Sequence, residues 1–281
     1  MNFYFGFGVW GFGFMRIAGL QKLTLIDFPG HVAATVFTQG CPFRCGFCHN
    51  PELVLPEKYE PILSEKQIFN FLESRYGKLT GICITGGEPL MQSDIDKFIS
   101  HMKALGFAVK LDTNGYYPDR LKKIIADGDV DYIAMDIKSS PTKYAMTIFN
   151  GQLSISNQIP KSKTQSVIPS PTFVGVNSIE GSRHSVSAGK NLENRIRQSI
   201  GLIVNSGIDY EFRTTVAKPL HSVEDFEGIG QLIKGAKRFF IQNYVKSKHI
   251  DESTNFEPFT DKELKEAKKI MKKYVMEVGI R

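Results

Sequence analysis

Residues 31–50, HVAATVFTQGCPFRCGFCHN, join an apolar strand-like run to a loop that carries three of the chain's four cysteines. Cys41, Cys45 and Cys48 follow the spacing C-x3-C-x2-C. Thiolates are soft ligands that suit iron–sulfur clusters, zinc or copper. Iron–sulfur clusters normally take four cysteine ligands, so three in one loop would leave one iron open to a substrate or cofactor. The loop predicts such a cluster; the alternative is a structural zinc loop completed by His49 or a distant side chain.

The strand before this loop is the first of six strand-then-helix units. Strands are predicted at residues 32–38, 81–85, 107–111, 132–135, 210–216 and 238–242. Helices are predicted at residues 65–75, 95–105, 119–126, 192–205, 222–233 and 261–278, the first preceded by a capping box at Ser64 and Gln67. This alternation predicts a single α/β domain, a partial TIM-type (β/α)6 barrel.

Three segments fall outside that regular pattern. Residues 1–14, MNFYFGFGVWGFGF, lack the basic residues of a signal peptide and are too short to span a bilayer, so we expect a disordered extension or a mis-called start before Met15. Residues 139–190 are rich in Ser, Asn, Pro, Lys and Gly, and we expect a flexible insertion within a domain of residues 15–250. Residues 251–281 are expected to form a C-terminal helix.

Composition limits the classes of function. The chain has 281 residues, 42% hydrophobic and 23% charged, with a net charge of +6 spread along its length. This mild excess suits docking to an acidic partner, and no aromatic and basic signature of a nucleic-acid-binding module is present. Four cysteines clustered in this way do not form a disulfide framework but indicate metal-bound thiolates in a reducing setting. We therefore expect a cytoplasmic protein with no membrane segment.

Distinctive polar groups follow each of the first four predicted strands. After the cysteine loop come Gly86-Gly87-Glu88, then Asp112, and then Asp136 with Lys138. Alone, these would read as a turn, a helix cap and a surface ion pair. In barrel enzymes, however, functional groups gather on loops at the carboxyl ends of the strands. The ordered series predicts one common site.

With these motifs the chain resembles the radical S-adenosylmethionine enzymes. The resemblance is closest to the activating enzymes of glycyl-radical proteins, in particular those of anaerobic ribonucleoside-triphosphate reductase, and covers about residues 15–244 without the insertion. The motifs that carry it are LIDFPG (25–30), CPFRCGFCHN (41–50), ITGGEPL (84–90), DTNG (112–115), MDIK (135–138) and YEFRTT (210–215).

The resemblance implies a role for each site residue. Cys41, Cys45 and Cys48 would bind three irons of a [4Fe–4S] cluster, and S-adenosyl-L-methionine would chelate the fourth iron. The other expected contacts are Phe47 with the adenine, Gly86, Gly87 and Glu88 with the methionine ammonium, Lys138 with the carboxylate, and Asp112, Thr113 and Asp136 with a monovalent cation. Arg213 and Gln242 would line the substrate side. Cys83, inside a strand, is predicted to be a buried structural thiol.

The implied activity is reductive cleavage of S-adenosylmethionine to a 5′-deoxyadenosyl radical, which takes a hydrogen from a glycine of a partner enzyme. The expected partners are a class III ribonucleotide reductase and, as electron donor, flavodoxin or ferredoxin. The rival within the family is an enzyme acting on a small molecule, similar to 7-carboxy-7-deazaguanine synthase. The rival from another class is a non-catalytic metal-binding or electron-transfer protein.

Overall fold

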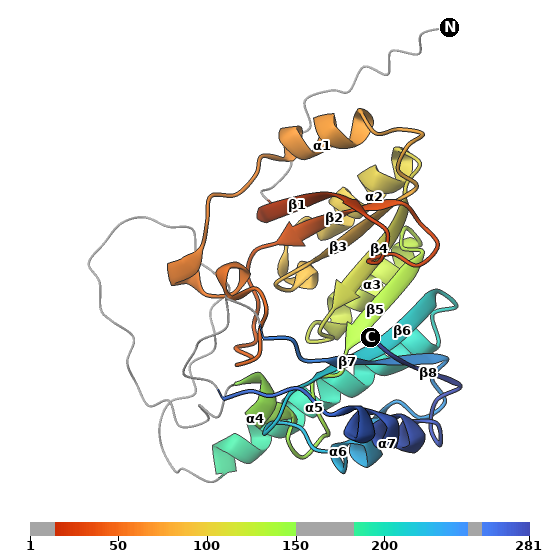
Figure 1. Cartoon of the computed structure of the whole chain (residues 1–281). Helices are drawn as coiled ribbons and strands as arrows, with labels where there is room; N and C mark the ends of the chain where they lie inside the picture. The colour runs from red at the N-terminus through yellow and green to blue at the C-terminus, as the bar shows by residue number, and fades with distance from the viewer. Residues whose placement is uncertain (1–14, 150–182, 247–254) are drawn as a thin grey trace, which may run out of the picture.

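The computed structural model describes residues 15–149, 183–246 and 255–281. Its helices pack around one central sheet (Figure 1). The eight strands of the described residues lie in chain order across the sheet. They are β1 (Ile17–Thr24), β2 (Ala33–Thr38), β3 (Gly81–Gly86), β4 (Ala108–Thr113), β5 (Tyr132–Asp136), β6 (Asp209–Val216), β7 (Arg238–Asn243) and β8 (Glu277–Ile280). β1 runs antiparallel to β2, and every later neighbouring pair is parallel.

The strands β2 to β7 form the predicted partial barrel. Each is followed by helical structure that packs outside the sheet, and the order from β1 to β8 leaves the sheet open. The α-helices are α1 (Glu65–Glu73), α2 (Ile95–Ala104), α3 (Pro118–Asp127), α4 (Tyr144–Ile148), α5 (Arg183–Val204), α6 (Asp225–Leu232) and α7 (Asp261–Met271). Short 3-10 turns occupy Pro51–Leu53, Pro56–Lys58 and Pro89–Met91. The capping box that starts α1 is present as predicted, with Ser64 and Gln67 bonded reciprocally.

Two predicted segments have different bounds in the structure. The expected insertion, residues 139–190, contains all of α4 and the start of α5; residues 150–182 lie outside the described part, as do residues 1–14. The predicted C-terminal helix ends early, because α7 stops at Met271 and β8 follows. Val278 looked like the last apolar position of a helix, but it pairs with Phe239 on β7 instead.

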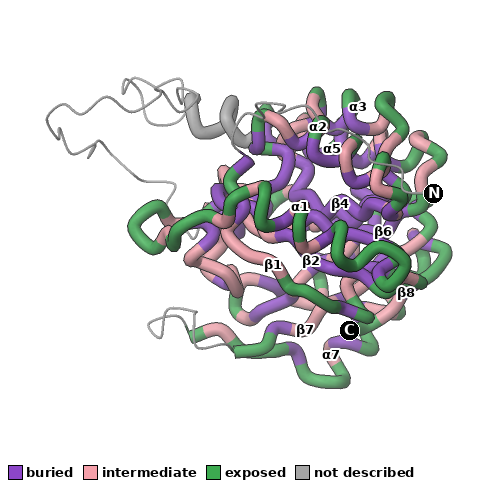
Figure 2. Tube along the Cα trace, turned by 90° about the horizontal axis from the view of Figure 1, so that it is seen from above, coloured by how far each residue is buried: buried purple, intermediate pink, exposed green. Residues whose placement is uncertain are grey.

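The two faces of the parallel sheet carry opposite kinds of side chain. Strand residues alternate between faces. On β4, Val109 and Leu111 belong to the large apolar core, whereas Lys110 and Asp112 point to the other face. β6 repeats this with Tyr210 and Phe212 in the core. Figure 2 shows the buried residues concentrated in the central strands and the helix sides turned toward them. We call the polar, concave side the inner face.

Candidate active site

A cavity of about 500 Å³ lies at the carboxyl ends of the parallel strands. The loops after β2 and β3 line it together with the ends of β4 to β7. It brings together all of the predicted site residues: Cys41, Cys45, Cys48, Phe47, Gly86, Gly87, Glu88, Asp112, Thr113, Asp136, Lys138, Arg213 and Gln242. Parallel strands end at the same edge of a sheet. Residues about 200 positions apart in sequence, such as Cys41 and Gln242, can therefore share this one pocket.

The cysteine loop holds its three thiols without any disulfide. The Cys41 sulfur accepts from the Phe43 amide at 3.4 Å and lies 3.6 Å from the Asn114 side-chain nitrogen. The Cys48 amide donates to the Cys45 carbonyl at 3.1 Å, which turns the chain back on itself. Burial raises the pKa of all three thiols, that of Cys45 to about 11. Such thiols stay protonated at neutral pH until a positive centre stabilises the thiolate.

Two glycines fix the second loop against the first. A Cβ on Gly86 would lie 2.3 Å from the Thr38 amide nitrogen, and one on Gly87 would lie 2.1 Å from the Gly40 carbonyl oxygen. Gly86 also has a φ of +113°, which other residues rarely adopt. The Glu88 amide donates to the Gly40 carbonyl at 2.8 Å. The glycine pair is therefore required for contact between the loops, which places Glu88 beside the cysteines.

Glu88 is a fully buried carboxylate on the wall of the cavity. It accepts from the Thr113 hydroxyl at 2.8 Å, the Asn114 amide at 2.7 Å and the Leu90 amide at 3.1 Å. Burial raises the pKa of Glu88 to about 7, although these hydrogen bonds oppose the shift. A carboxyl group with a pKa near 7 is only partly ionised at neutral pH. A cationic ligand beside it would stabilise the ionised form and would itself be bound more tightly.

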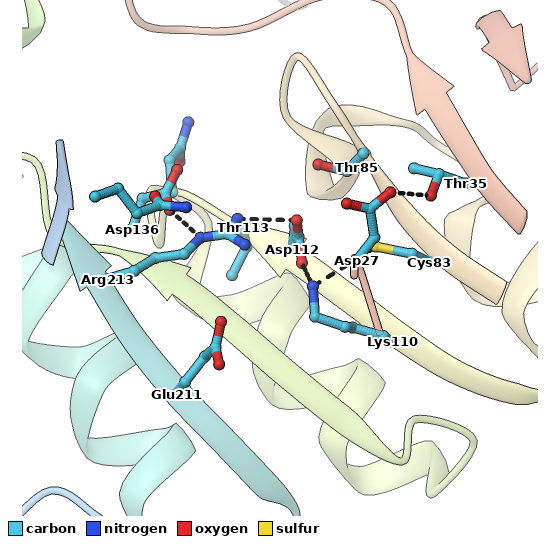
Figure 3. A network of polar contacts seen from close by, with 12 residues as sticks. Asp27, Thr35, Cys83, Thr85, Lys110, Asp112, Thr113, Asp136, Glu211 and Arg213 are labelled. Atoms are coloured by element: carbon cyan, nitrogen blue, oxygen red, sulfur yellow. Dashed lines mark hydrogen bonds and ion pairs between the residues drawn. The ribbon is translucent and has the colours of Figure 1, made fainter. Parts of the chain in front are cut away.

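A row of five alternating charges crosses the inner face: Lys110, Asp112, Arg213, Asp136 and Lys138. Figure 3 labels the first four of them. Lys110 donates to Asp112, Arg213 donates to Asp112 at 2.8 Å and to Asp136 at 2.6 Å, and Lys138 donates to Asp136 at 2.8 Å. Burial alone would raise the pKa of both carboxyls, but Arg213 and the lysines lower it below the usual range. All five groups are therefore charged at neutral pH.

Several predicted residues have a defined neighbour in the structure. Phe47 is buried against Ala217 and Tyr244, with its ring edge-on to His221 at 5.7 Å between centroids. Gln242 accepts from the Thr215 hydroxyl at 3.4 Å. Lys138 reaches the cavity but donates to Asp136, so a ligand carboxylate there would add a second acceptor to it.

Cys83 is buried inside β3, as predicted for a structural thiol, and lies 3.6 Å from the Lys110 ammonium nitrogen. His49, the candidate zinc ligand, contacts the Val245 carbonyl oxygen at 3.1 Å through Nε2. Among residues 15–149, 191–246 and 255–281, no three His, Cys, Asp or Glu side chains are grouped closely enough to hold a single metal ion.

Three polar residues on the inner face or beside the cavity were not predicted from the sequence. Lys110 extends the charge row, Asn114 approaches Cys41, and Glu211 accepts a bidentate pair from Arg281 at 2.8 and 2.9 Å. The signal for Lys110 and Glu211 was the alternation within VKLDT and YEFRTT, where every second residue is apolar. That alternation indicates a strand with one apolar and one polar face.

The donor set fits the cofactors that the resemblance implies. Cys41, Cys45 and Cys48 are free thiols at one cavity, and they are soft ligands suited to iron. The same cavity offers the buried Glu88 carboxylate and the Lys138 ammonium, charges opposite to those of an amino acid's ammonium and carboxylate groups.

Within the described part of the chain, no helix is long and apolar enough to cross a membrane.

Comparison with known proteins identifies a domain and several relatives that this chain resembles. Residues 35–154 match the model of the Radical SAM superfamily. A Methanocaldococcus jannaschii protein, MJ1227, named provisionally as a glycyl-radical enzyme activating enzyme, is 28% identical over 94% of this chain and 95% of its own length. The pyruvate formate-lyase-activating enzyme of Clostridium pasteurianum is 32% identical over 44% of this chain and 52% of its own length.

The fold is also similar to that of solved structures. The crystal structure of Streptococcus suis SuiB bound to S-adenosylmethionine superposes with a TM-score of 0.57 at 15% identity, covering 86% of this chain and 48% of that one. This chain thus spans about half the length of SuiB and of the Clostridium enzyme. The chain thus carries a Radical SAM domain at residues 35–154, and the relatives it resembles in sequence are glycyl-radical enzyme activating enzymes.

Proposed function

We propose that this protein is an activating enzyme that cleaves S-adenosylmethionine reductively and generates a glycyl radical on a partner enzyme. The observation that carries the proposal is the meeting of three free thiols with Glu88 and Lys138 in one cavity. Cys41, Cys45 and Cys48 would hold a [4Fe–4S] cluster. A cluster held there would supply the one electron, received from an external donor, that cleaves S-adenosylmethionine to methionine and a 5′-deoxyadenosyl radical.

The protein's own residues would bind and orient the ligand. Glu88 would accept from its ammonium, Lys138 would pair with its carboxylate, and Phe47 would contact the adenine. Arg213 and Gln242 line the same cavity, and they would face the substrate. Removing a hydrogen atom requires no general acid or base from the protein, so these residues position the reactants and exclude water.

For the partner, we propose a class III anaerobic ribonucleoside-triphosphate reductase, with flavodoxin or ferredoxin as the electron donor. The motifs LIDFPG, CHN and EFRTT support this choice. A second candidate partner is a pyruvate formate-lyase, because the Clostridium pasteurianum relative activates that enzyme, as its name states.

The test is to mix the anaerobically reconstituted protein, a chemical reductant and S-adenosylmethionine with each candidate partner in turn. A glycyl-radical doublet in the electron paramagnetic resonance spectrum of the reductase is the expected result. The matched control is a reductase in which the radical glycine is replaced by alanine. A doublet only with pyruvate formate-lyase would select the second partner.

Two further outcomes address the rival functions. Formation of 5′-deoxyadenosine without a protein radical, and only in the presence of a small molecule, would support an enzyme of the carboxy-deazaguanine synthase kind. Zinc in place of iron and sulfide in the purified protein would contradict the radical chemistry altogether.

A further inference from the structure

The guanidinium of Arg213 lies between the two carboxylates that the sequence resemblance assigned to a monovalent cation (Figure 3). Its terminal nitrogen donates to Asp112 at 2.8 Å, and its Nε donates to Asp136 at 2.6 Å. The side chains of Arg213 and Asp112 are only 14% and 12% exposed, so water screens this contact weakly. Arg213 thus bridges β4 and β5 from its place on β6.

The third expected cation ligand is engaged elsewhere. The Thr113 hydroxyl donates to Glu88 at 2.8 Å, and its oxygen accepts from the Gly115 amide at 3.1 Å. The second carboxylate oxygen of Asp112 accepts from Lys110, and that of Asp136 accepts from Lys138, so each of the four oxygens already faces a positive group. The three predicted cation ligands therefore do not fit a metal ion in this arrangement.

Charge balance gives the same answer. Lys110, Arg213 and Lys138 contribute three positive charges against two from Asp112 and Asp136. The row already has one positive charge in excess, so an added cation would place a second one in a largely buried region, where an unpaired charge is costly. Arginine suits the bridging position because its guanidinium is always charged and donates from more than one edge.

We propose that Arg213 takes the place of the monovalent cation, so that this protein needs no metal ion beside the carboxylate of its ligand. Lys138 is the end of the row that lines the cavity, where it can meet that carboxylate. The identity of the ligand, S-adenosylmethionine, rests on the proposed function; the absence of a need for a cation rests on the Arg213 contacts alone.

The test compares two variants that remove the same charge but leave different space. Arg213→Ala opens a gap between Asp112 and Asp136, whereas Arg213→Met fills it with an apolar chain. Arg238→Ala, a second inner-face arginine at the opposite end of the neighbouring strand, is the matched control. Each anaerobically reconstituted full-length protein is studied in potassium chloride, sodium chloride and tetramethylammonium chloride at equal ionic strength.

Two readouts are measured: the thermal unfolding midpoint without ligand, and the Kd for S-adenosylmethionine by calorimetry. We expect the wild type and Arg238→Ala to change less than about twofold in Kd between the salts, with an unchanged midpoint. Arg213→Ala should bind about tenfold more weakly in tetramethylammonium, and potassium or sodium should restore most of the loss and raise the midpoint. Arg213→Met should be weak in every salt.

A wild-type Kd or midpoint that depends on potassium or sodium would overturn the proposal, and this result needs no variant to fold. A folded Arg213→Ala without a cation response, or an Arg213→Met that is rescued equally, would also overturn it. If the wild type does not bind S-adenosylmethionine at all, the proposed function fails instead. The ligand-free midpoints of the wild type and Arg213→Ala would still decide the cation question.

Discussion

The outer face of the parallel strands is apolar, whereas the inner face carries the row of buried charges beside a small apolar cluster. On β5, Ile133 and Met135 pack into the apolar core under the helices, while Asp136 at the strand end faces the charge row. Burial of apolar groups on the outer face stabilises the fold. The buried charges of the inner face are costly to desolvate and are weak evidence for stability. This contrast indicates that the inner face and its rim are built for binding, and each prediction below tests it.

The largest effect is expected at the rim. Cys45→Ala should reduce 5′-deoxyadenosine formation to background, a loss of more than about 100-fold, because even partners of metal ligands cost 10- to 100-fold. Iron and sulfide content, together with turnover in anaerobic assays, measures it. Cys83→Ala is the matched control. Cys83 lies inside β3, away from the three cysteine ligands, so this variant protein should keep its iron. Normal turnover by Cys45→Ala would refute the ligand assignment.

On the outer face, truncation should cost stability. Ile133→Ala removes a fully buried side chain and should lower the free energy of unfolding by about 2–5 kcal/mol, because a cavity remains. Met276→Ala, at a side chain 83% exposed, should change it by less than about 0.5 kcal/mol. Denaturant unfolding measures both. Equal losses in the free energy of unfolding would mean that apolar packing on the outer face is not what stabilises the fold.

Glu88 should make stability depend on pH. Its pKa rises from 4.5 to about 7 on folding because of burial, so between these values the folded protein binds more protons than the unfolded chain. The free energy of unfolding should therefore fall by roughly 2–3 kcal/mol relative to Glu88→Gln as the pH rises from about 4.5 to 7, and the difference should stay constant above that.

Thermal midpoints of the wild type and Glu88→Gln across this pH range measure the effect. Asp131→Asn, at a more exposed carboxylate next to the amino end of β5, serves as the control substitution. Parallel curves of midpoint against pH for the wild type and Glu88→Gln would show that folding does not raise the pKa of Glu88.

The smallest effect is expected at the far end of the inner face. Glu211→Gln weakens the paired donors of Arg281 and should cost about 1–3 kcal/mol of stability. S-adenosylmethionine affinity should change little, since Glu211 does not line the cavity and acts on it only through its partner Arg281, which does. Glu277→Gln, an exposed carboxylate on β8, is the control. A large loss of affinity in Glu211→Gln would extend the binding region down the whole inner face.

Local patterns were sufficient to predict most of the fold. The six strand-then-helix units are present because apolar periodicity and caps act over a few residues, as in the capping box before α1. The end of α7 was wrong, since the choice between helix and strand at Val278 depends on its pairing with β7. Two helical segments within the expected insertion, α4 and the start of α5, were not predicted, because neither shows a clear apolar period in the sequence.

The cysteine spacing and the series GGE, DTNG and MDIK determined by themselves that a thiolate site lies at the carboxyl ends of parallel strands. That information is carried by chain order, which the sequence contains. Only the tertiary structure decided how the charges pair. Arg213 lies about a hundred residues beyond Asp112 in the chain, yet it bridges Asp112 and Asp136. Such contacts follow from strand register and side-chain reach, which no local pattern specifies.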